Sequence, residues 1–252
     1  MIYEGKSKSV FKTEEDGIVN IFFKNDITAF NGEKHDVVKD KGLMNCYMSA
    51  FFMRMFTENN IPNHFLEMVD DQTQRCVSVD IIPVEVVVRN IAAGSFCKRF
   101  GIEKGTRIKT QRRSSVYREP GINGDTPLVE FFFKSDEHGD PPMSKEHAIM
   151  FGMATSEELE HMRYVALQVN NVLINYWSKL DIDLVDFKIE FGRTKTGTVI
   201  LADEMTPDAC RLWKTGTQES MDKDVYRFGP GVDALAESYK ALYDQIKSVE
   251  KA

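Results

Sequence analysis

The sequence predicts a mixed α+β fold, and three patterns support that class. The first forty residues carry short β-branched and aromatic runs separated by a turn-like Glu-Glu-Asp-Gly segment, which is typical of a small antiparallel sheet. Thr155 and Glu158 have the spacing of a capping box and open a long helical pattern, which a strand hairpin follows. Residues 232–249 then predict a closing helix, so strands and helices are interspersed along the chain.

The first hundred residues are expected to begin as strands and to contain two helices. Apolar side chains at near-helical spacing predict the longer helix, and the Asn-Asn-Ile-Pro segment that ends at Pro62 cannot continue it. Two β-branched runs flank Pro83, and Gly94 lies where the second run gives way to a short helix. The predicted elements are strands over 9–12, 18–24, 76–80 and 84–90, and helices over 43–59 and up to Phe100.

The remaining residues predict a basic connection, a strand, a long helix and a hairpin. Residues 101–127 contain many lysines and arginines but few aliphatic residues, which is typical of a long solvated loop or an exposed hairpin. The Lys-Thr-Gly-Thr segment at 195–198 is typical of a hairpin loop. The predicted elements are strands over 128–134, 184–193 and 199–203, and helices over 155–179 and 232–249.

The overall charge speaks against broad nucleic-acid or membrane-surface binding. The 252 residues include 32 Lys plus Arg and 39 Asp plus Glu, which gives a net charge of −7. We therefore expect an anionic ligand to be held by a local basic pocket, with no nucleic acid and no membrane as partner. Four cysteines without a CxxC pair predict reduced thiols, and the first residues lack a signal-like apolar run, so we expect a cytoplasmic protein.

The predicted strand over 184–193 carries ionisable side chains in alternation with apolar ones. Asp186, Lys188 and Glu190 share one face, because side chains of a strand alternate with a period of two. With a four-residue loop over 195–198, Glu190 lies directly opposite Asp203 on the partner strand. Two opposed carboxylates repel each other, and Mg²⁺ would remove that repulsion. The alternative is a solvated, charged strand face without a metal.

Three further segments could bind phosphate or polar groups. The Gly-Lys-Ser-Lys segment that ends at Lys8 is either a phosphate grip or a solvated basic tip, because it lacks the Walker A pattern. Residues 89–95 pass from a strand into a helix, where Arg89, Ser95 and backbone N–H groups could converge on one phosphate. The loop over 203–211 is dense in metal-binding and phosphate-binding side chains. The five histidines lack ligand spacing, and serine-hydrolase and protein-kinase motifs are absent.

Taken together, these segments resemble the SAICAR synthetase (phosphoribosylaminoimidazole-succinocarboxamide synthase) family nearly from end to end. The resemblance rests on several ordered motifs, which are more specific than any one of them alone. They are Tyr-Glu-Gly-Lys-Ser-Lys at 3–8, Val-Glu-Val-Val-Val-Arg-Asn at 84–90 with Ala-Ala-Gly-Ser at 92–95, Asp-Phe-Lys-Ile-Glu-Phe-Gly at 186–192, and the segment from Asp203-Glu204 through Pro207-Asp208 to Arg211-Leu212-Trp213.

The resemblance implies a ligase of purine biosynthesis. ATP, carboxyaminoimidazole ribonucleotide (CAIR) and L-aspartate would become ADP, phosphate and a succinocarboxamide. It also implies a kinase-like antiparallel N-terminal sheet packed on a C-terminal α+β part, with the ATP cleft between them. We expect a nucleotide-binding subdomain over 1–83, a substrate-binding and metal-binding subdomain over 84–252, and a homodimer.

The resemblance also implies roles for individual residues. Lys6 and Lys8 would face the ATP phosphates, and the backbone of Ile82, Val84 and Glu85 would meet adenine. Lys188, together with Lys8, would stabilise the transferring phosphoryl group. The other implied roles are the ribonucleotide phosphate for Arg89, Ser95 and Arg211, polar groups of that substrate for Asp186 and Asp208, Mg²⁺ for Glu190 and Asp203, and L-aspartate for the candidates Lys134 and Asp136.

Two other functions are compatible with parts of the sequence. A small-molecule kinase would use the same ATP cleft and metal carboxylates but transfer phosphate to a hydroxyl group. A nucleotide-binding or RNA-binding module would use the arginine-rich segment over 104–118. Neither the kinase nor the binding module accounts for the whole ordered set of motifs.

The sequence departs from the family at one place. The segment over 109–126 is longer than the corresponding connection in compact bacterial members of the family.

Overall fold

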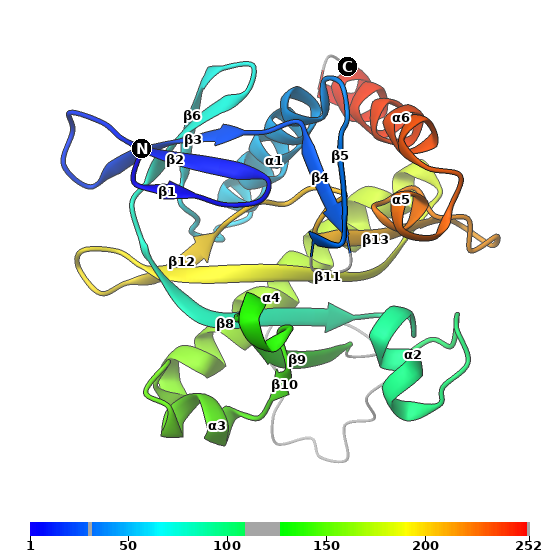
Figure 1. Ribbon diagram of the computed structural model, residues 1–252. Coiled ribbons are helices and arrows are strands. Elements are labelled where there is room, and N and C mark those ends of the chain that lie inside the picture. The colour runs from blue at the N-terminus through cyan, green and yellow to red at the C-terminus, as the bar shows by residue number, and fades with distance from the viewer. Residues whose placement is uncertain (30–31, 109–126, 251–252) are drawn as a thin grey trace.

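Two antiparallel sheets organise the computed structural model, which describes residues 1–29, 32–108 and 127–250 (Figure 1). The N-terminal sheet has the strand order β1-β2-β3-β7-β6, and the second sheet has the order β10-β9-β8-β11-β12, with β13 also paired to β11. The N-terminal sheet comprises β1 (Tyr3–Glu4), β2 (Lys8–Lys12), β3 (Ile18–Phe23), β6 (Phe65–Asp70) and β7 (Thr73–Val77). The second comprises β8 (Asp80–Arg89), β9 (Leu128–Phe133), β10 (Pro142–Met143), β11 (Ile182–Arg193), β12 (Val199–Ala202) and β13 (Cys210–Lys214).

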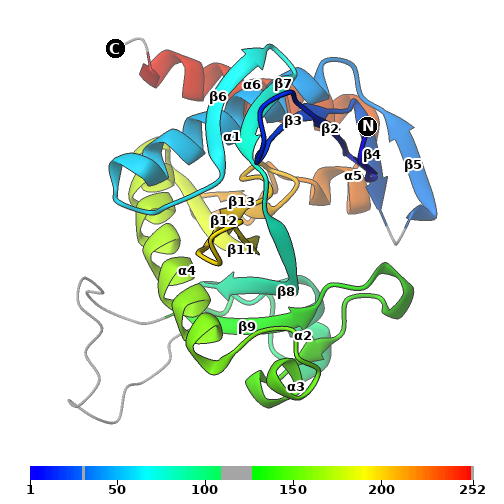
Figure 2. The ribbon, with the colours of Figure 1, turned by 90° about the vertical axis from the view of Figure 1, so that its left-hand side faces the viewer.

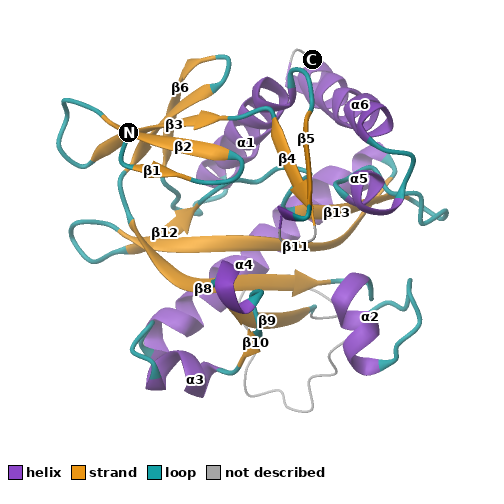
Figure 3. Ribbon diagram, viewed as in Figure 1, coloured by secondary structure: helices purple, strands orange, loops and turns teal. Residues whose placement is uncertain are grey.

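Helices and one additional hairpin cover these sheets (Figure 3). The hairpin pairs β4 (Asp26–Ala29) with β5 (Lys34–Val37). The helices are α1 (Lys41–Glu58), α2 (Gly94–Phe100), α3 (Lys145–Met150), α4 (Ser156–Trp177), α5 (Asp224–Phe228) and α6 (Val232–Glu250), with 3₁₀ turns at Asp136–His138 and Ser178–Leu180. Helix α1 packs on the N-terminal sheet and on α6, while α4 packs across β8 and β11. The predicted α+β class is confirmed.

One apolar core joins both sheets. The alternation in β8 places Ile82, Val84, Val86 and Val88 in this core with no exposed surface, and the opposite face of the strand carries Glu85 and Arg89. Figure 2 shows the chain descending from the N-terminal sheet at β7 directly into β8 of the second sheet. The space between the sheets is therefore bordered by this crossing and by the face of β8 that carries Glu85.

The long helix α4 begins where the sequence predicts. The side chain of Thr155 accepts a hydrogen bond from the backbone N–H of Glu158 at 3.2 Å, and the Thr155 N–H donates to the Glu158 carboxylate at 2.7 Å. This reciprocal pair satisfies two N–H groups that a helix start leaves without partners. Of the other predicted elements, the strand expected over 76–80 is wrong, because β7 ends at Val77 and β8 begins at Asp80.

The predicted hairpin register between β11 and β12 is wrong by one residue. Arg193 pairs with Val199 and Glu190 pairs with Ala202, so Asp203 is not opposite Glu190. The loop has three residues rather than four: the Thr194 N–H donates to the Thr198 carbonyl, and Gly197 has a φ of +83°. A tight turn followed by a glycine in the left-handed region is a standard three-residue hairpin loop.

Part of the basic connection predicted over 101–127 is described. Its first residues return along the end of β8, where the Ala92 N–H donates to the Thr106 carbonyl at 2.8 Å and the Ile108 N–H donates to the Asn90 carbonyl at 2.8 Å. The segment over 109–126, and most of the arginine-rich stretch over 104–118, lie outside the described residues. Across the described ranges, no helix has both the length and the apolar character required to cross a membrane. All four cysteines are free thiols.

Candidate active site

A cavity of about 760 Å³ lies between the two sheets and is lined by residues from both. The N-terminal sheet and its crossing to β8 supply mainly apolar side chains, which are Val10, Val19, Ile21, Val77, Val79 and Ile81. The second sheet and the loop after β12 supply mainly charged ones, which are Glu85, Lys188, Glu190, Asp203, Glu204 and Asp208. An apolar wall beside a charged region suits a ligand that has a flat ring at one end and anionic groups at the other.

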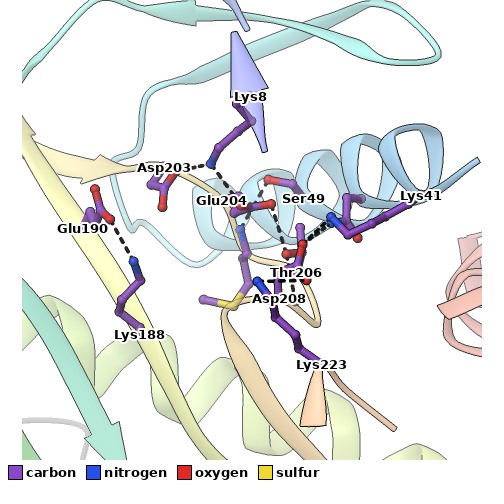
Figure 4. A network of polar contacts seen from close by, with 12 residues as sticks. Lys8, Lys41, Ser49, Lys188, Glu190, Asp203, Glu204, Thr206, Asp208 and Lys223 are labelled. Carbon is purple, nitrogen blue, oxygen red and sulfur yellow. Dashed lines mark hydrogen bonds and ion pairs between the residues drawn. The ribbon is translucent and has the colours of Figure 1, made fainter. Parts of the chain in front are cut away.

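The side chain of Lys8, at the start of β2, reaches the acidic loop after β12, which contains Asp203 and Glu204 (Figure 4). Its ammonium group contacts the carboxylate of Asp203 and lies 3.1 Å from that of Glu204. Burial alone would raise the pKa of Asp203, but the charges of Lys8 and Lys188 outweigh burial and hold that pKa well below its ordinary value. Burial likewise opposes the charge of Lys8, and the two carboxylates raise its pKa. The pair is therefore ionised throughout the physiological pH range.

Lys188 bridges two carboxylates on neighbouring strands. Glu190 of β11 lies opposite Glu85 of β8, and the Lys188 ammonium is 2.7 Å from the Glu85 carboxylate and 2.9 Å from that of Glu190. Lys134 adds a second ammonium 2.7 Å from Glu190. Burial would lower the pKa of Lys188, but Glu190 and Glu85 raise it well above its ordinary value. Lys188 and Lys134 thus offset the repulsion between the carboxylates of Glu85 and Glu190.

Asp208 forms the centre of a third group, which the sequence did not predict. The Lys41 ammonium lies 2.5 Å from its carboxylate, and Asn45 and the Tyr239 hydroxyl donate to it at 2.9 and 2.8 Å. Lys223 is 3.9 Å away. These partners come from α1, α6 and the turn before α5, so Asp208 ties three distant segments to the wall of the cavity.

His64 supports the acidic loop from the side. Its Nε2 lies 2.9 Å from the backbone carbonyl of Asp203, a residue whose φ of +63° is in the left-handed region. Burial lowers the pKa of His64 to about 4, so the ring is neutral at pH 7 and its Nε2–H donates to the carbonyl. A non-glycine residue in this conformation costs about 1 kcal/mol or more, and the hydrogen bond from His64 helps to offset that cost.

Arg89, Asp186 and Arg211 form a separate cluster that does not line the cavity. Arg89 and Arg211 donate to the same Asp186 oxygen at 2.8 and 2.9 Å. Glu130 accepts from Arg89 at 2.5 Å, and Asp224 accepts from Arg211 at 2.8 Å. All three residues are buried or half-buried, so their positions are fixed by ion pairs on more than one side.

The start of α2 lies against this arginine cluster. Gly94 has a φ of +55°, and a Cβ atom at this position would lie 2.6 Å from a terminal nitrogen of Arg211. Only glycine therefore allows the Arg211 guanidinium to approach the helix start. Ser95 is the next residue after Gly94 and is exposed. The family resemblance grouped Arg89, Ser95 and Arg211; in the structure Arg89 and Arg211 meet at Asp186, and Ser95 follows Gly94 at the start of α2.

The remaining predicted residues fall at different positions. Lys6 lies at the cavity with its ammonium 2.7 Å from Asp136, and both side chains are exposed. Ile82 and Val84 bury their side chains in the core, so only their backbone could reach a ligand. The backbone around them is partly engaged, because the Pro83 carbonyl accepts a hydrogen bond from the Lys134 N–H at 3.1 Å.

A metal site built from protein ligands alone is absent from the described residues, which contain no cluster of three or more His, Cys, Asp or Glu side chains suited to one. Glu190 and Asp203 nevertheless both present carboxylates to the same cavity. Such a donor set fits Mg²⁺, which usually binds one or two carboxylates and takes its other ligands from phosphates and water. Each carboxylate also contacts a lysine, which competes with any cation for it.

Comparisons with known proteins agree with this arrangement. The sequence model of SAICAR synthetase matches residues 1–244. A phosphoribosylaminoimidazole-succinocarboxamide synthase from Exiguobacterium sp. is 42% identical over 245 residues, which cover 97% of each chain. The crystal structure of the synthase of the same name from Ehrlichia chaffeensis has a TM-score of 0.87 and 38% identity, with 98% of both chains covered.

A second solved structure adds a nucleotide. It is described as SAICAR synthetase (Type-2) in complex with ADP, and it has a TM-score of 0.87 and 38% identity over 98% of this chain and 97% of that one. These matches confirm the predicted family, enzyme class and fold class, and they do not favour the kinase or RNA-binding alternatives. On these grounds the chain belongs to the SAICAR synthetase family.

Proposed function

We propose that this protein joins L-aspartate to the carboxylate of CAIR at the expense of ATP, which gives SAICAR, ADP and phosphate in de novo purine biosynthesis. One observation carries the proposal most directly: lysines and carboxylates from both sheets converge on one cavity, and a fixed arginine cluster lies beside it. Family membership and the ADP bound to one relative support the same reading.

The cavity provides complementary surfaces for ATP. The adenine ring would lie on the apolar wall that includes Val10, Ile21 and Ile81, near the backbone of Ile82, Val84 and Glu85. Lys6 and Lys8 would face the phosphates, because they extend from the N-terminal sheet into the charged region. In this proposal residues 1–83 form the nucleotide-binding subdomain, and residues 84–252 bind the other substrates and the metal.

The arginine cluster would hold the phosphate of CAIR. Arg89 and Arg211 present planar guanidinium groups whose fork geometry matches a phosphate, and the Ser95 hydroxyl and the start of α2 could add donors. Asp186, which orients both arginines, and Asp208 would contact polar groups of the same substrate. The imidazole carboxylate would then extend towards Lys188.

The residues of the cavity fit the chemistry that the reaction needs. A carboxylate is a poor electrophile, so one of its oxygens first attacks the γ-phosphorus while the bond to the ADP oxygen breaks. The aspartate amine then attacks the resulting acyl phosphate, loses a proton and displaces phosphate. Positioning and charge neutralisation provide most of the catalysis in phosphoryl transfer, and Lys8 and Lys188 supply positive charge at the site.

Magnesium belongs to the proposal through Glu190 and Asp203, which would hold it together with ATP phosphates. When bound, it would neutralise charge on the phosphate oxygens. Lys134 and Asp136 line the same cavity and are candidates for contacts with L-aspartate. We further propose that the enzyme works as a homodimer in the cytoplasm, where its four free thiols would remain reduced.

An assay of ADP formation tests the proposal. Production of ADP should require ATP, CAIR, Mg²⁺ and L-aspartate together, and mass spectrometry should find aspartate nitrogen in the product. Turnover with CAIR in the absence of aspartate would instead indicate a kinase or an ATPase. Salt-dependent affinity for RNA, without turnover, would indicate a binding module.

A further inference from the structure

Lys223 is a cavity-lining cation whose charge the surrounding protein leaves largely unused. It lies just before α5, and its side chain is 17% exposed. Its ammonium group is 3.9 Å from Asp208, which is beyond hydrogen-bond distance. Figure 4 shows it approaching Asp208 from the side opposite to Lys41.

Asp208 does not need Lys223. Its Oδ2 contacts the Lys41 ammonium and accepts from Asn45, and its Oδ1 accepts from the Tyr239 hydroxyl. The Lys41 side chain is only 1% exposed and already balances the charge of Asp208. Lys223 therefore adds a second positive charge to a carboxylate that is already neutralised, in a wall of the cavity.

Burial opposes that second charge. It lowers the pKa of Lys223 from its ordinary value, with Asp208 acting in the other direction and Arg227 and Lys41 adding to the lowering. A half-buried ammonium with cationic neighbours is stabilised by an anion that enters the cavity. The neighbours of Lys223 also indicate where such an anion would lie. Asp208 lines the cavity, whereas Arg227 pairs with Asp224, which also pairs with Arg211 of the arginine cluster. The anion would therefore lie between the cavity and the cluster.

We propose that Lys223 binds a substrate carboxylate, at the junction between the phosphoryl-transfer region and the arginine cluster. Two carboxylate sources meet the description: L-aspartate and the imidazole carboxylate of CAIR. The inference rests on the proposed function, because both ligands follow from it. The carboxylate would accept hydrogen bonds from the ammonium group and remove its unfavourable isolated charge.

The test compares Lys223→Met with Lys223→Arg and with Lys214→Met. Lys214 is a matched control from the same region, because it is half-exposed, pairs with Glu219 and does not line the cavity. In Lys223→Met, the KM for one carboxylate substrate should rise by about tenfold to a hundredfold, with the KM for ATP unchanged. A change confined to L-aspartate identifies that substrate as the source, and a change confined to CAIR identifies the other. Lys223→Arg should restore much of the affinity.

Two outcomes would overturn the inference. Unchanged KM values for both carboxylate substrates would show that Lys223 contacts neither, and an equal rise in all three KM values would show a structural role. Aspartate-dependent turnover of the wild-type enzyme and of Lys214→Met tests the proposed function separately, because both proteins keep Lys223. Melting temperatures of all variants verify that the fold is intact.

Discussion

The cavity and the neighbouring arginine cluster hold charge in different ways. In the cavity, single lysine nitrogens lie between carboxylates, as Lys188 lies between Glu85 and Glu190. In the cluster, each guanidinium group is fixed on two sides, as Arg211 is by Asp186 and Asp224. An ammonium group is a compact charge on a flexible stem, whereas a guanidinium group is a rigid fork.

Under the proposed function, this difference would correspond to two tasks. A phosphoryl group that moves from one oxygen to another needs positive charge that can follow it, and lysines can exchange a carboxylate partner for a phosphate oxygen. A phosphate that only anchors a substrate needs donors that stay in place, and paired arginines provide them. Substitutions in the two regions should therefore change different kinetic constants.

The largest effect is expected in the cavity, from Lys188→Met. It removes the ammonium group that contacts Glu85 and Glu190, so positive charge is lost where phosphate charge develops. We expect kcat to fall by about a hundredfold to a thousandfold, with little change in the KM for CAIR. Steady-state kinetics measure this, with Lys195→Met in the exposed hairpin loop as control. A change in KM alone would contradict the assigned role.

A smaller and different effect is expected in the arginine cluster, from Arg211→Lys. The charge is kept, but one nitrogen cannot contact Asp186, Asp224 and a phosphate in the geometry of a guanidinium group. The KM for CAIR should rise by about tenfold to a hundredfold, while the KM for ATP and kcat stay close to wild type. Arg54→Lys, in a surface pair with Glu250, is the matched control. Equal changes in both KM values would mean that the two regions are not separate.

The two regions also differ in what the sequence could predict about them. The alternation over 186–191 correctly placed Lys188 and Glu190 on one face, because the period of a strand is a local property. The predicted partner of Glu190 on β12 was wrong, because one residue more or less in the hairpin loop shifts the whole register. The gathering of Arg89, Asp186 and Arg211 came from the family resemblance and not from any local pattern.

Long-range contacts were the least predictable feature. Asp208 receives Lys41 from α1 and Tyr239 from α6, which lie far from it in sequence, and neither residue stands in a recognisable motif. The short strands β4, β5 and β13 were missed for a related reason, because their pairing depends on partners that the sequence does not specify. The fold class and the main strands and helices were predictable from periodicity and caps.

The corrected register changes the stability expected of Glu190→Gln. In the predicted register Glu190 lies opposite Asp203 and is repelled by it. Removing the charge of Glu190 would then leave the protein as stable as wild type or more stable. In the structure it is only 3% exposed and receives the ammonium groups of Lys134 and Lys188. We therefore expect a loss of about 2–3 kcal/mol in the free energy of unfolding, less than for a fully buried pair because both lysines can reach water. Chemical denaturation in EDTA measures it.

Glu219→Gln provides the comparison for that measurement. Glu219 pairs with Lys214 at the surface, where both side chains are at least half exposed, and its loss should cost less than about 1 kcal/mol. Wild-type or greater stability of Glu190→Gln would restore the idea of a repulsive carboxylate pair. A loss equal to that of Glu219→Gln would show that the lysines of the cavity contribute no more than surface ion pairs do.

The smallest effect should appear in the pH dependence of stability, through His64. Its pKa is about 4 in the folded protein, against 6.5 for an ordinary histidine, because burial disfavours the charged ring. Between these values the unfolded chain binds more protons than the folded one, so stability falls as pH falls from about 6.5 towards 4. From pH 7 to 5 this residue should account for a loss of about 1–2 kcal/mol. His64→Gln keeps a donor for the Asp203 carbonyl but cannot be protonated, so its stability should decline less steeply over that range.

Denaturation in EDTA at each pH measures the slope of stability against pH, with His138→Gln at an exposed position as control. Equal slopes of stability against pH for wild type and His64→Gln would contradict this prediction. They would mean that His64 can be protonated in the folded protein at no cost in stability.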